Sequence, residues 1–443
     1  MPRPRRTRLF ALALLLLVVS AVIGAGGTWA AFSSSTSTGA DTFSAAADWT
    51  APTTGAAVLA NGSGGQGVKQ AGTYNVYANI TDSGNPASGV ASATANVTNI
   101  TTGQTAVALT ACASNCTVGA TTYGYKSAQL TAKTPLTAGT QTFTVSSTDS
   151  AGNASTATSF NVTVDNTVPT VGTAVIAHST AGAGVKQGGT YFVYGNASDA
   201  STGAAGMTAN VNNITTGQTA VALTPCSSSC TVAGTTYGFK SAQLIASNPL
   251  TAGAQTYTLS ATDAAGNTSG TSSFSVTVDN TAPTASSSTT ANGTGNTGQP
   301  EAGDTIVLTF SQQMDPFSIL STWSGPSTPI VVRISNTGGA AHDFISFWNS
   351  TNTTQLPLGS IDLGRAGYVN TGATITFGAS GTASTMVQAV AVVTVTLGTP
   401  STTANRVINT TPLTWTPSTT ATDLAGNAVS GAAVTQASAV RQF

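Results

Sequence analysis

The chain contains a long internal duplication, and this feature restricts its fold more than any other. The segment Gly67–Tyr74 (GVKQAGTY) recurs as Gly184–Tyr191 (GVKQGGTY), which is a spacing of 117 residues. The segment Asn99–Thr110 (NITTGQTAVALT) recurs unchanged as Asn213–Thr224, which is a spacing of 114 residues. A repeat of this length is a whole domain rather than one unit of a solenoid.

Inside each copy, apolar residues alternate with polar ones. A period of two is typical of β-strands with one buried face, and strands separated by Gly, Asn and Asp turns favour a β-sandwich. The copies differ in length by three residues between Asp82 and Ala95, which we expect to be a loop. The matched apolar positions are Tyr74/Tyr191, Val76/Val193, Ala78/Gly195, Ile80/Ala197, Phe143/Tyr257, Val145/Leu259, Phe160/Phe274, Val162/Val276 and Val164/Val278.

The composition supports a folded, all-β chain and argues against a nucleic-acid partner. Hydrophobic residues make up 40% and charged residues 6%, whereas disordered chains combine low hydrophobicity with high net charge. Four of the 13 basic residues lie in the first eight positions, so the remaining nine face 14 acidic residues. No basic patch is left to neutralise phosphates.

The N-terminus has the layout of a secretory signal peptide. A basic stretch, residues 1–8, precedes the apolar run Leu9–Ile23, and small residues follow. If the run continues through Ala31, it is long enough to span a membrane. The alternative to cleavage is therefore an uncleaved anchor, which would be the chain's sole contact with a membrane.

The segment Gly26–Phe43 (GGTWAAFSSSTSTGADTF) carries a more specific resemblance. It resembles signal regions cut by the SipW-type signal peptidase, as in camelysin and biofilm fibre subunits. The resemblance implies export by a Gram-positive bacterium, with cleavage near Ala30–Phe32, in the region formed by Ala30, Ala31 and Phe32. It carries no implication for the fold, because the chain departs from that family after Ala51.

The two copies also resemble a known class of domain. The phrases Thr148–Asn153 (TDSAGN) and Thr262–Asn267 (TDAAGN) occur with the linkers Val164–Pro169 (VDNTVP) and Val278–Pro283 (VDNTAP). These look like the bacterial Ig-like repeats of large surface adhesins, over about residues 52–284. The resemblance implies tandem Ig-like sandwiches and names no ligand.

A third, different segment follows. Ala302–Asp315 (AGDTIVLTFSQQMD) resembles the first strand of another bacterial Ig-like type, found in S-layer and surface proteins, and a last strand is expected near Ala421–Val429. We interpret this segment as one enlarged sandwich, with an insertion or a fused extra sheet as the alternative. Further candidate strands are Ile330–Ile334, Phe344–Trp348, Ala373–Phe377 and Val390–Leu397.

The predicted organisation is therefore a signal peptide at 1–31 and an N-terminal segment at 32–51, followed by three domains. We call these the first repeat (52–168), the second repeat (169–284) and the third segment (285–443), which is a divergent Ig-like domain.

The four cysteines form two C-x3-C pairs, one in each repeat: Cys112 with Cys116, and Cys226 with Cys230. Four cysteines allow three pairings. The repeat selects the pairing within each copy, and export favours its oxidation. A redox or metal site is the alternative, but zinc needs four N or S ligands and no histidine is near.

The sequence contains no recognisable catalytic motif, so we expect no enzyme. The two histidines are His178 and His342, and His342 is followed by Asp343. A Ser-His-Asp site would need a nucleophile motif that is absent. The acids Glu301, Asp304 and Asp315 belong to a strand motif of surface proteins, so a turn role is expected rather than a glycosidase pair.

Four aspartates, Asp149, Asp165, Asp263 and Asp279, recur at the ends of the repeats. Carboxylates clustered at Ig-like junctions suit calcium, which takes six to eight oxygen ligands. Asp and Asn also stabilise turns by bonding their own backbone. We therefore expect no cofactor, with calcium as the alternative.

These patterns predict a secreted or cell-surface structural or adhesive protein of the cell envelope or biofilm matrix. Its partners would be glycans of the cell wall or the extracellular space, or surface proteins. The alternative is a carbohydrate-binding module that acts with secreted enzymes, because Trp323, Trp348 and Trp415 all fall in the third segment. Aromatic rings stack on sugars when exposed, but they more often belong to the core.

Overall fold

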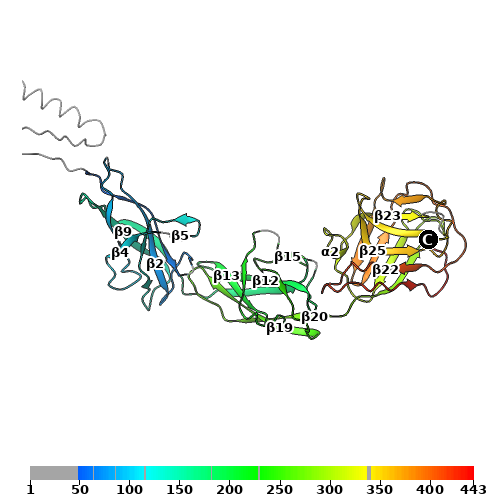
Figure 1. Ribbon diagram of the computed structural model, residues 1–443, viewed down its shortest axis with the longest axis horizontal. Helices are drawn as coiled ribbons and strands as arrows, with labels where there is room; N and C mark the ends of the chain where they lie inside the picture. Colours follow the sequence, from blue (N-terminus) through cyan, green and yellow to red (C-terminus); the bar gives the residue numbers. More distant parts are fainter. Residues whose placement is uncertain are drawn as a thin grey trace, which may run out of the picture. The chain divides into compact units, whose positions relative to one another are not determined.

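A computed structural model describes residues 48–443 except 63, 85, 114–115, 181, 228–229 and 337–340. The expected cleavage region, Ala30, Ala31 and Phe32, lies outside the described residues. The chain divides into two compact units, one ending at Asn166 and one running from Thr167 to Phe443. The predicted fold class is confirmed: the chain is all-β and forms tandem Ig-like sandwiches (Figure 1).

The first repeat is one antiparallel sheet that folds around a main core. Its strand order is β1-β2-β7-β4-β3-β9-β10, with β8 paired to β2. A parallel bridge pairs Val68, in the segment between β1 and β2, with Val164 at the end of β10. The strands are β1 (Thr53–Asn61), β2 (Thr73–Thr81), β3 (Val90–Asn96), β4 (Val107–Ala111), β7 (Tyr125–Ser127), β8 (Leu130–Thr131), β9 (Gly139–Asp149) and β10 (Thr158–Val164).

The second repeat has the same strand order, β11-β12-β17-β14-β13-β19-β20, with β18 paired to β12. The three-residue length difference lies in a loop, as predicted, since residues 82–89 connect β2 to β3 whereas 199–203 connect β12 to β13. The strands are β11 (Thr170–Ala177), β12 (Thr190–Ser198), β13 (Ala204–Asn210), β14 (Val221–Pro225), β17 (Phe239–Ser241), β18 (Leu244–Ile245), β19 (Gly253–Asp263) and β20 (Ser272–Val278).

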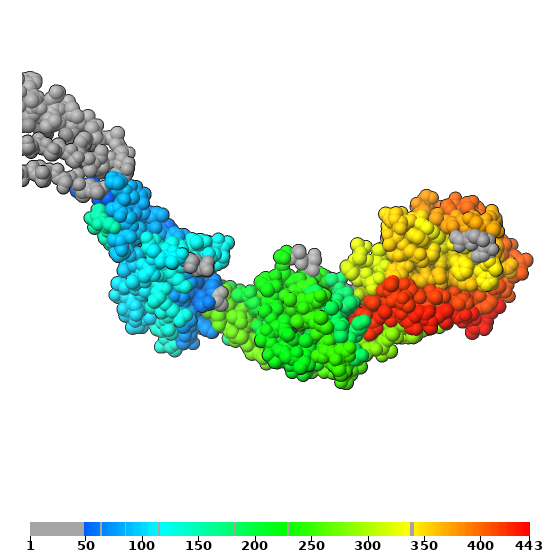
Figure 2. All heavy atoms as spheres, in the orientation of Figure 1, coloured from blue at the N-terminus to red at the C-terminus, as the bar shows by residue number. Residues whose placement is uncertain are grey.

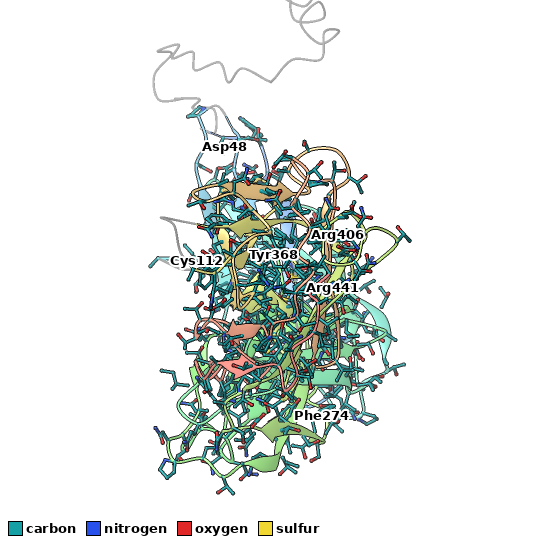
Figure 3. The ribbon with its side chains drawn as sticks, turned by 90° about the vertical axis from the view of Figure 1, so that its right-hand side faces the viewer. Asp48, Cys112, Phe274, Tyr368, Arg406 and Arg441 are labelled. Carbon is teal, nitrogen blue, oxygen red and sulfur yellow. A yellow bond between two sulfur atoms is a disulfide. The ribbon has the colours of Figure 1, made fainter. Side chains whose placement is uncertain are left out.

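Each repeat also has a small hairpin that packs on the outer face of its sheet. The hairpins are β5 (Thr117–Val118) with β6 (Thr121–Thr122), and β15 (Thr231–Val232) with β16 (Thr235–Thr236). The disulfides Cys112–Cys116 and Cys226–Cys230 lie at their bases, and Cα atoms are 6.2 Å apart in each pair (Cys112 is labelled in Figure 3).

These hairpins correct the expectation that the strands bury one face. In the first repeat Tyr77, Cys116, Val118 and Tyr123 form a second apolar cluster, separate from the main core. Tyr77 is therefore buried although it lies on the face opposite Tyr74. The second repeat builds the same cluster around Tyr194.

The third segment is a ten-stranded sheet in the order β21-β22-β28-β27-β23-β24-β25-β29-β30, with β26 paired to β23. It closes around one core, and the C-terminal stretch, red in Figure 2, lies against the yellow and orange parts of this segment. Its elements are β21 (Ala285–Ala291), β22 (Thr305–Phe310), α2 (Pro316–Ile319), β23 (Thr328–Ser335), β24 (Phe344–Asn349), β25 (Gln355–Asp362), β26 (Thr374–Phe377), β27 (Ser384–Ala389), β28 (Val392–Thr396), β29 (Thr414–Thr416) and β30 (Val434–Thr435).

The last strand predicted near Ala421–Val429 is wrong. Asp423 Oδ1 accepts hydrogen bonds from the backbone N–H groups of Ala425 (2.9 Å) and Asn427 (2.8 Å), and these bonds curl the chain into a turn instead. The predicted strand Val390–Leu397 begins late, because Val390 occupies the hairpin turn with φ 51°. The sequence also gave no indication of β25, whose buried residues are interrupted by Pro357 and Gly359.

Candidate functional site

The TDxxGN phrase folds into the same tight turn in all three domains. In the first repeat, Asp149 Oδ1 accepts from the Asn153 backbone N–H at 2.8 Å, and Asp149 Oδ2 accepts from Asn153 Nδ2 at 2.8 Å. The pairs Asp263–Asn267 and Asp423–Asn427 repeat both bonds at 2.7–2.9 Å. One carboxylate accepts two hydrogen bonds from the asparagine and so fixes the position of its amide, in the manner of an Asx turn.

The asparagine amide then holds the backbone that leads into its own domain. Asn153 Nδ2 donates to the carbonyl of Asp48 at 3.0 Å, and Asn427 Nδ2 donates to the carbonyl of Asp279 at 2.9 Å. Asp48 precedes the first repeat, and Asp279 precedes the third segment. The turn therefore clamps the linker at the entry of both domains.

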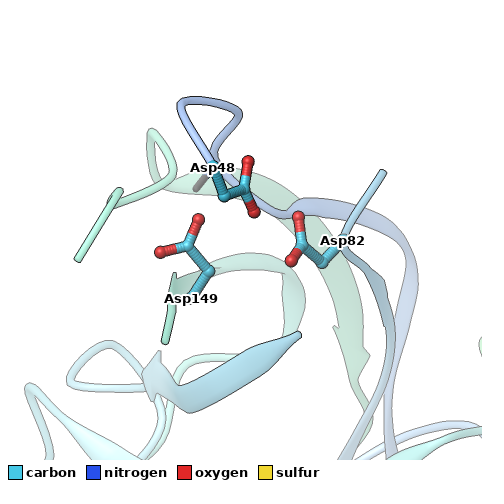
Figure 4. A group of neighbouring side chains, drawn as sticks. All are labelled: Asp48, Asp82 and Asp149. Atoms are coloured by element: carbon cyan, nitrogen blue, oxygen red, sulfur yellow. The ribbon is translucent and has the colours of Figure 1, made fainter. Parts of the chain in front are cut away.

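At the entry of the first repeat, three carboxylates converge on one point. Asp48, Asp82 and Asp149 each bring one ligand oxygen within 4.8 Å of the others, and Figure 4 shows their carboxylates turned toward a common centre. Asp48 accepts from the backbone N–H groups of Thr50 and Ser88, both at 2.9 Å. These bonds, that from Thr50 first, lower the pKa of Asp48 below its usual value.

This geometry could hold a divalent cation. Asp82 Oδ2 accepts from the Gly89 N–H at 2.6 Å, whereas Asp82 Oδ1 is buried and has no hydrogen-bond partner among the described residues. Clustered carboxylate oxygens are the ligands that calcium prefers. The sequence pointed to Asp149 but missed Asp48 and Asp82. The repeat could have indicated both residues. Asp48 lies 117 residues before Asp165, and Asp82 lies 117 residues before Asp199, which is the repeat spacing.

The entry of the third segment contains the same turn, but an amide is bound to the turn carboxylate in place of a third carboxylate. There Gln312 Nε2 donates to Asp423 Oδ2. It also donates to the carbonyl of Thr281, and this second bond measures 2.9 Å. Asp279 and Asp423 line a cavity of about 190 Å³ together with Gln312. In the third segment an amide donor therefore binds the turn carboxylate, whereas the first repeat brings three carboxylates together.

The histidine candidate does not form a triad. His342 Nδ1 lies 2.9 Å from Asp362 rather than pairing with its neighbour Asp343, and no hydroxyl of the described residues bonds its ring. Asp343 is fully buried and accepts from the backbone N–H groups of Gly367 (2.9 Å) and Tyr368 (2.7 Å). Asp343 therefore organises a loop, and the described residues supply no nucleophile to the His342–Asp362 pair.

The acids near residue 300 have local roles. Asp304 accepts from the N–H groups of Gly293 and Glu301, both at 2.8 Å, and burial raises its pKa. Asp315 caps α2 by accepting from the Phe317 N–H at 2.9 Å, and burial raises its pKa as well. Loop closure and helix capping account for these carboxylates.

The three tryptophans of the third segment have different environments. Trp323 and Trp415 are buried in the core, as expected for most aromatic residues. Trp348 is half-buried on the outer face of β24. The guanidinium carbon of Arg333 lies 3.4 Å from the centroid of the Trp348 ring, so one face of that ring is covered.

No protein-family model matches the chain, and no curated protein matches it. Solved structures that align with it include the fibronectin(III)-like modules of Clostridium thermocellum CbhA, at 13% identity and a TM-score of 0.26 over 50% of this chain and 94% of that one. They also include a Ca2+-stabilised adhesin of an Antarctic bacterium that binds ice, at 17% identity and a TM-score of 0.21 over 81% of this chain and 76% of that one.

A third alignment is with the sialic acid binding region of a Streptococcus sanguinis SK1 adhesin, at 12% identity and a TM-score of 0.19 over 59% of this chain and 93% of that one. All three scores are too low to carry an argument about function. In the part of the chain that the structure describes, no helix is long and apolar enough to cross a membrane.

Proposed function

We propose that this protein is a secreted or cell-surface structural and adhesive protein whose Ig-like modules act as rigid spacers. The modules are the first repeat (52–168), the second repeat (169–284) and the third segment (285–443). The observation that carries this proposal is the recurring TDxxGN turn, because its asparagine clamps the linker at the entry of a module.

The joint between the second repeat and the third segment supports a rigid spacer. Three alternate positions of the linker accept hydrogen bonds from the third segment. Asn427 Nδ2 reaches the carbonyl of Asp279 (2.9 Å), Gln312 Nε2 that of Thr281 (2.9 Å), and the Ser430 N–H that of Pro283 (2.8 Å). Proline further limits the linker, because its ring fixes φ.

The location rests on two features. The N-terminal layout suits a secretory signal, cut near Ala30–Phe32 by a SipW-type peptidase of a Gram-positive cell. Each repeat also carries a disulfide, and disulfides persist outside the reducing cytosol. Glycans of the cell wall or matrix and other surface proteins are the partners that such a location offers.

The test compares cells that produce the wild-type chain with cells that lack it. We expect protease shaving to release the protein from intact cells or matrix, sequencing to place the mature N-terminus at Ala30–Phe32, and deletion to reduce aggregation or surface attachment. A flexible Gly-Ser insertion after Asp279 should fail to restore attachment at an equal surface level. The matched control is the same insertion after Gly103, an exposed turn glycine of the first repeat.

If the insertion after Asp279 restores attachment fully, the rigid-spacer role is wrong. Robust turnover of a polymer or ester by the purified chain would instead contradict a structural protein and point to an enzyme.

A further inference from the structure

The outer face of the third segment carries an arginine, Arg333, that forms no ion pair with any residue in the described part of the chain. Arg333 lies on β23, with Thr376 of β26 on one side of it and Ser346 of β24 on the other, and Ser346 in turn pairs with Ser360 of β25. All four residues are half-buried. These four residues form a row across the four strands, in which the guanidinium of Arg333 lies between side chains that carry hydroxyl groups.

The guanidinium of Arg333 is held in a fixed position. Its Nε donates to Asn352 Oδ1 and its Nη2 donates to the Asn352 carbonyl, both at 2.8 Å. Its plane covers Trp348, whose indole N–H is itself fixed to Ser346 Oγ at 2.9 Å. Asn352 can present both acceptors because it sits in the left-handed region, φ 58°, which asparagine tolerates better than most residues.

The loop that carries Asn352 is braced as well. Asn349 Oδ1 accepts from the backbone N–H groups of Thr353 (2.9 Å) and Thr354 (3.1 Å), and the Asn352 N–H donates to the Asn349 carbonyl at 2.8 Å. The arginine is thus pre-organised, which reduces the entropy lost when it binds a ligand.

Part of this guanidinium has no partner within residues 48–443 as far as the structure describes them. Arginine has five N–H donors, and Asn352 takes one from Nε and one from Nη2. Among the described residues no carboxylate forms an ion pair with Arg333, since the ion pair found there joins His342 and Asp362. The edge of the guanidinium formed by Nη1 and Nη2 therefore retains donors for an external acceptor.

We propose that this face binds carboxylate groups of an acidic polysaccharide, with Arg333 as the residue that recognises the charge. The free edge of the guanidinium matches the two oxygens of a carboxylate. The hydroxyls of Thr376, Ser346 and Ser360 lie in the same row, where they can bond sugar hydroxyls. Stacking of a neutral sugar on the ring face of Trp348 that Arg333 covers is blocked.

A polysaccharide fits this face better than an acidic peptide. Peptides commonly bind sheets by adding a strand to a free edge. Here β23, β24 and β25 are each paired on both sides, so no edge is free next to Arg333. An extended polymer instead lies across the face and uses side chains. This site is independent of the proposed spacer role, which rests on the joints between modules.

The test uses the exported full chain and polygalacturonate as the probe, with binding measured by calorimetry. Arg333→Gln should weaken binding at least about tenfold, because charge-assisted hydrogen bonds are lost. Arg333→Lys should also weaken it, because lysine keeps the charge but lacks the planar edge. Asn352→Ala should give a smaller loss, since the guanidinium remains but is no longer held.

The matched control is Arg441→Gln. Arg441 is an exposed arginine of the same segment, labelled in Figure 3, whose Nε donates to the Ile408 carbonyl at 3.1 Å. This variant should bind as the wild type does, and near-UV circular dichroism should show that all variants remain folded. Fully methyl-esterified polygalacturonate has the same backbone without the charge and should not bind.

Several outcomes overturn the proposal. These are no binding to polygalacturonate, equal binding of the methyl ester, or an Arg333→Gln chain that binds like Arg441→Gln. Equal or tighter binding of polyglutamate would show that the surface takes acidic peptides instead. Tighter binding of a teichoic acid would show that phosphate is the group recognised. None of these outcomes bears on the spacer role, which the linker insertion tests separately.

Discussion

The hydroxyl of Tyr257 offers a sharp test of how the repeats are packed. Tyr257 is 2% exposed, and its hydroxyl is buried without a hydrogen-bond partner among the described residues. The equivalent residue of the first repeat is Phe143, which is also 2% exposed. The rings have the same environment, because Phe143 lies 5.6 Å from Phe160 and Tyr257 lies 5.7 Å from Phe274, both at 29°.

Tyr257→Phe should therefore stabilise the second repeat. Burial raises the pKa of Tyr257 well above its usual value, so the group removed is a neutral hydroxyl. A buried polar group without a partner costs about 1–3 kcal/mol. Its removal should raise the free energy of unfolding by about that amount, which is roughly a 5- to 150-fold change in the opening equilibrium.

The matched control is Tyr191→Phe in the same repeat. Tyr191 is also buried, but its hydroxyl bonds Thr215 Oγ1 at 2.6 Å. Loss of this bond should lower the free energy of unfolding by about 0.5–1.5 kcal/mol, so the two substitutions should have opposite signs.

Native-state hydrogen exchange of the full chain can measure both effects, because it reports stability segment by segment. The slowest amides of β19 and β20 should exchange more slowly in Tyr257→Phe and faster in Tyr191→Phe, while those of the first repeat stay unchanged. A Tyr257→Phe chain that is unchanged or less protected would refute the reasoning, since the hydroxyl would then have a partner such as a bound water.

Three further outcomes are expected. Phe443→Ala should destabilise the third segment by about 3–5 kcal/mol in urea unfolding, because Phe443 is 1% exposed in the core and its ring lies 6.1 Å from that of Tyr368. Burial raises the pKa of Asp315, so the folded state binds a proton on this carboxylate more readily than the unfolded state does. The stability of the wild type should therefore rise relative to that of Asp315→Asn as the pH falls from 7 to 4. Urea midpoints of the two chains that change in parallel with pH would contradict this. Calcium at ten times its Kd should stabilise the first repeat by about 1.4 kcal/mol in thermal unfolding, and Asp82→Asn should abolish the effect.

Most of the fold could be predicted from the sequence, because the duplication marks the domains and the period-two alternation marks the strands. The outer hairpins could not. Tyr77 is buried by Val118 and Tyr123, which follow it by more than 40 positions, and nothing in the strand pattern itself indicates that cover. The alternation identified Tyr74 correctly and left the opposite face of β2 without an explanation.

The residues of the candidate sites also divide into those that the sequence identified and those that it did not. His342 and Asp343 are adjacent in sequence, but just before a strand such neighbours point to opposite sides. Asp343 is therefore buried while His342 reaches Asp362 across to β25. Asp149 was identified from its repeated phrase. Its neighbours Asp48 and Asp82 come from a linker and from a loop, where the strand pattern gives no signal.

The entries of the first repeat and of the third segment share one hydrogen bond but differ in the charges around it. The asparagine-to-linker bond is the same, at 3.0 Å from Asn153 and 2.9 Å from Asn427, so the backbone geometry is retained. The charge around it is not retained, because Gln312 donates to Asp423 where the first repeat brings Asp48 and Asp82 to Asp149. Three carboxylates repel one another unless a cation or protons intervene, whereas the amide arrangement is complete within the chain. A bound cation should therefore stabilise the entry of the first repeat, whereas the entry of the third segment should hold its linker without one.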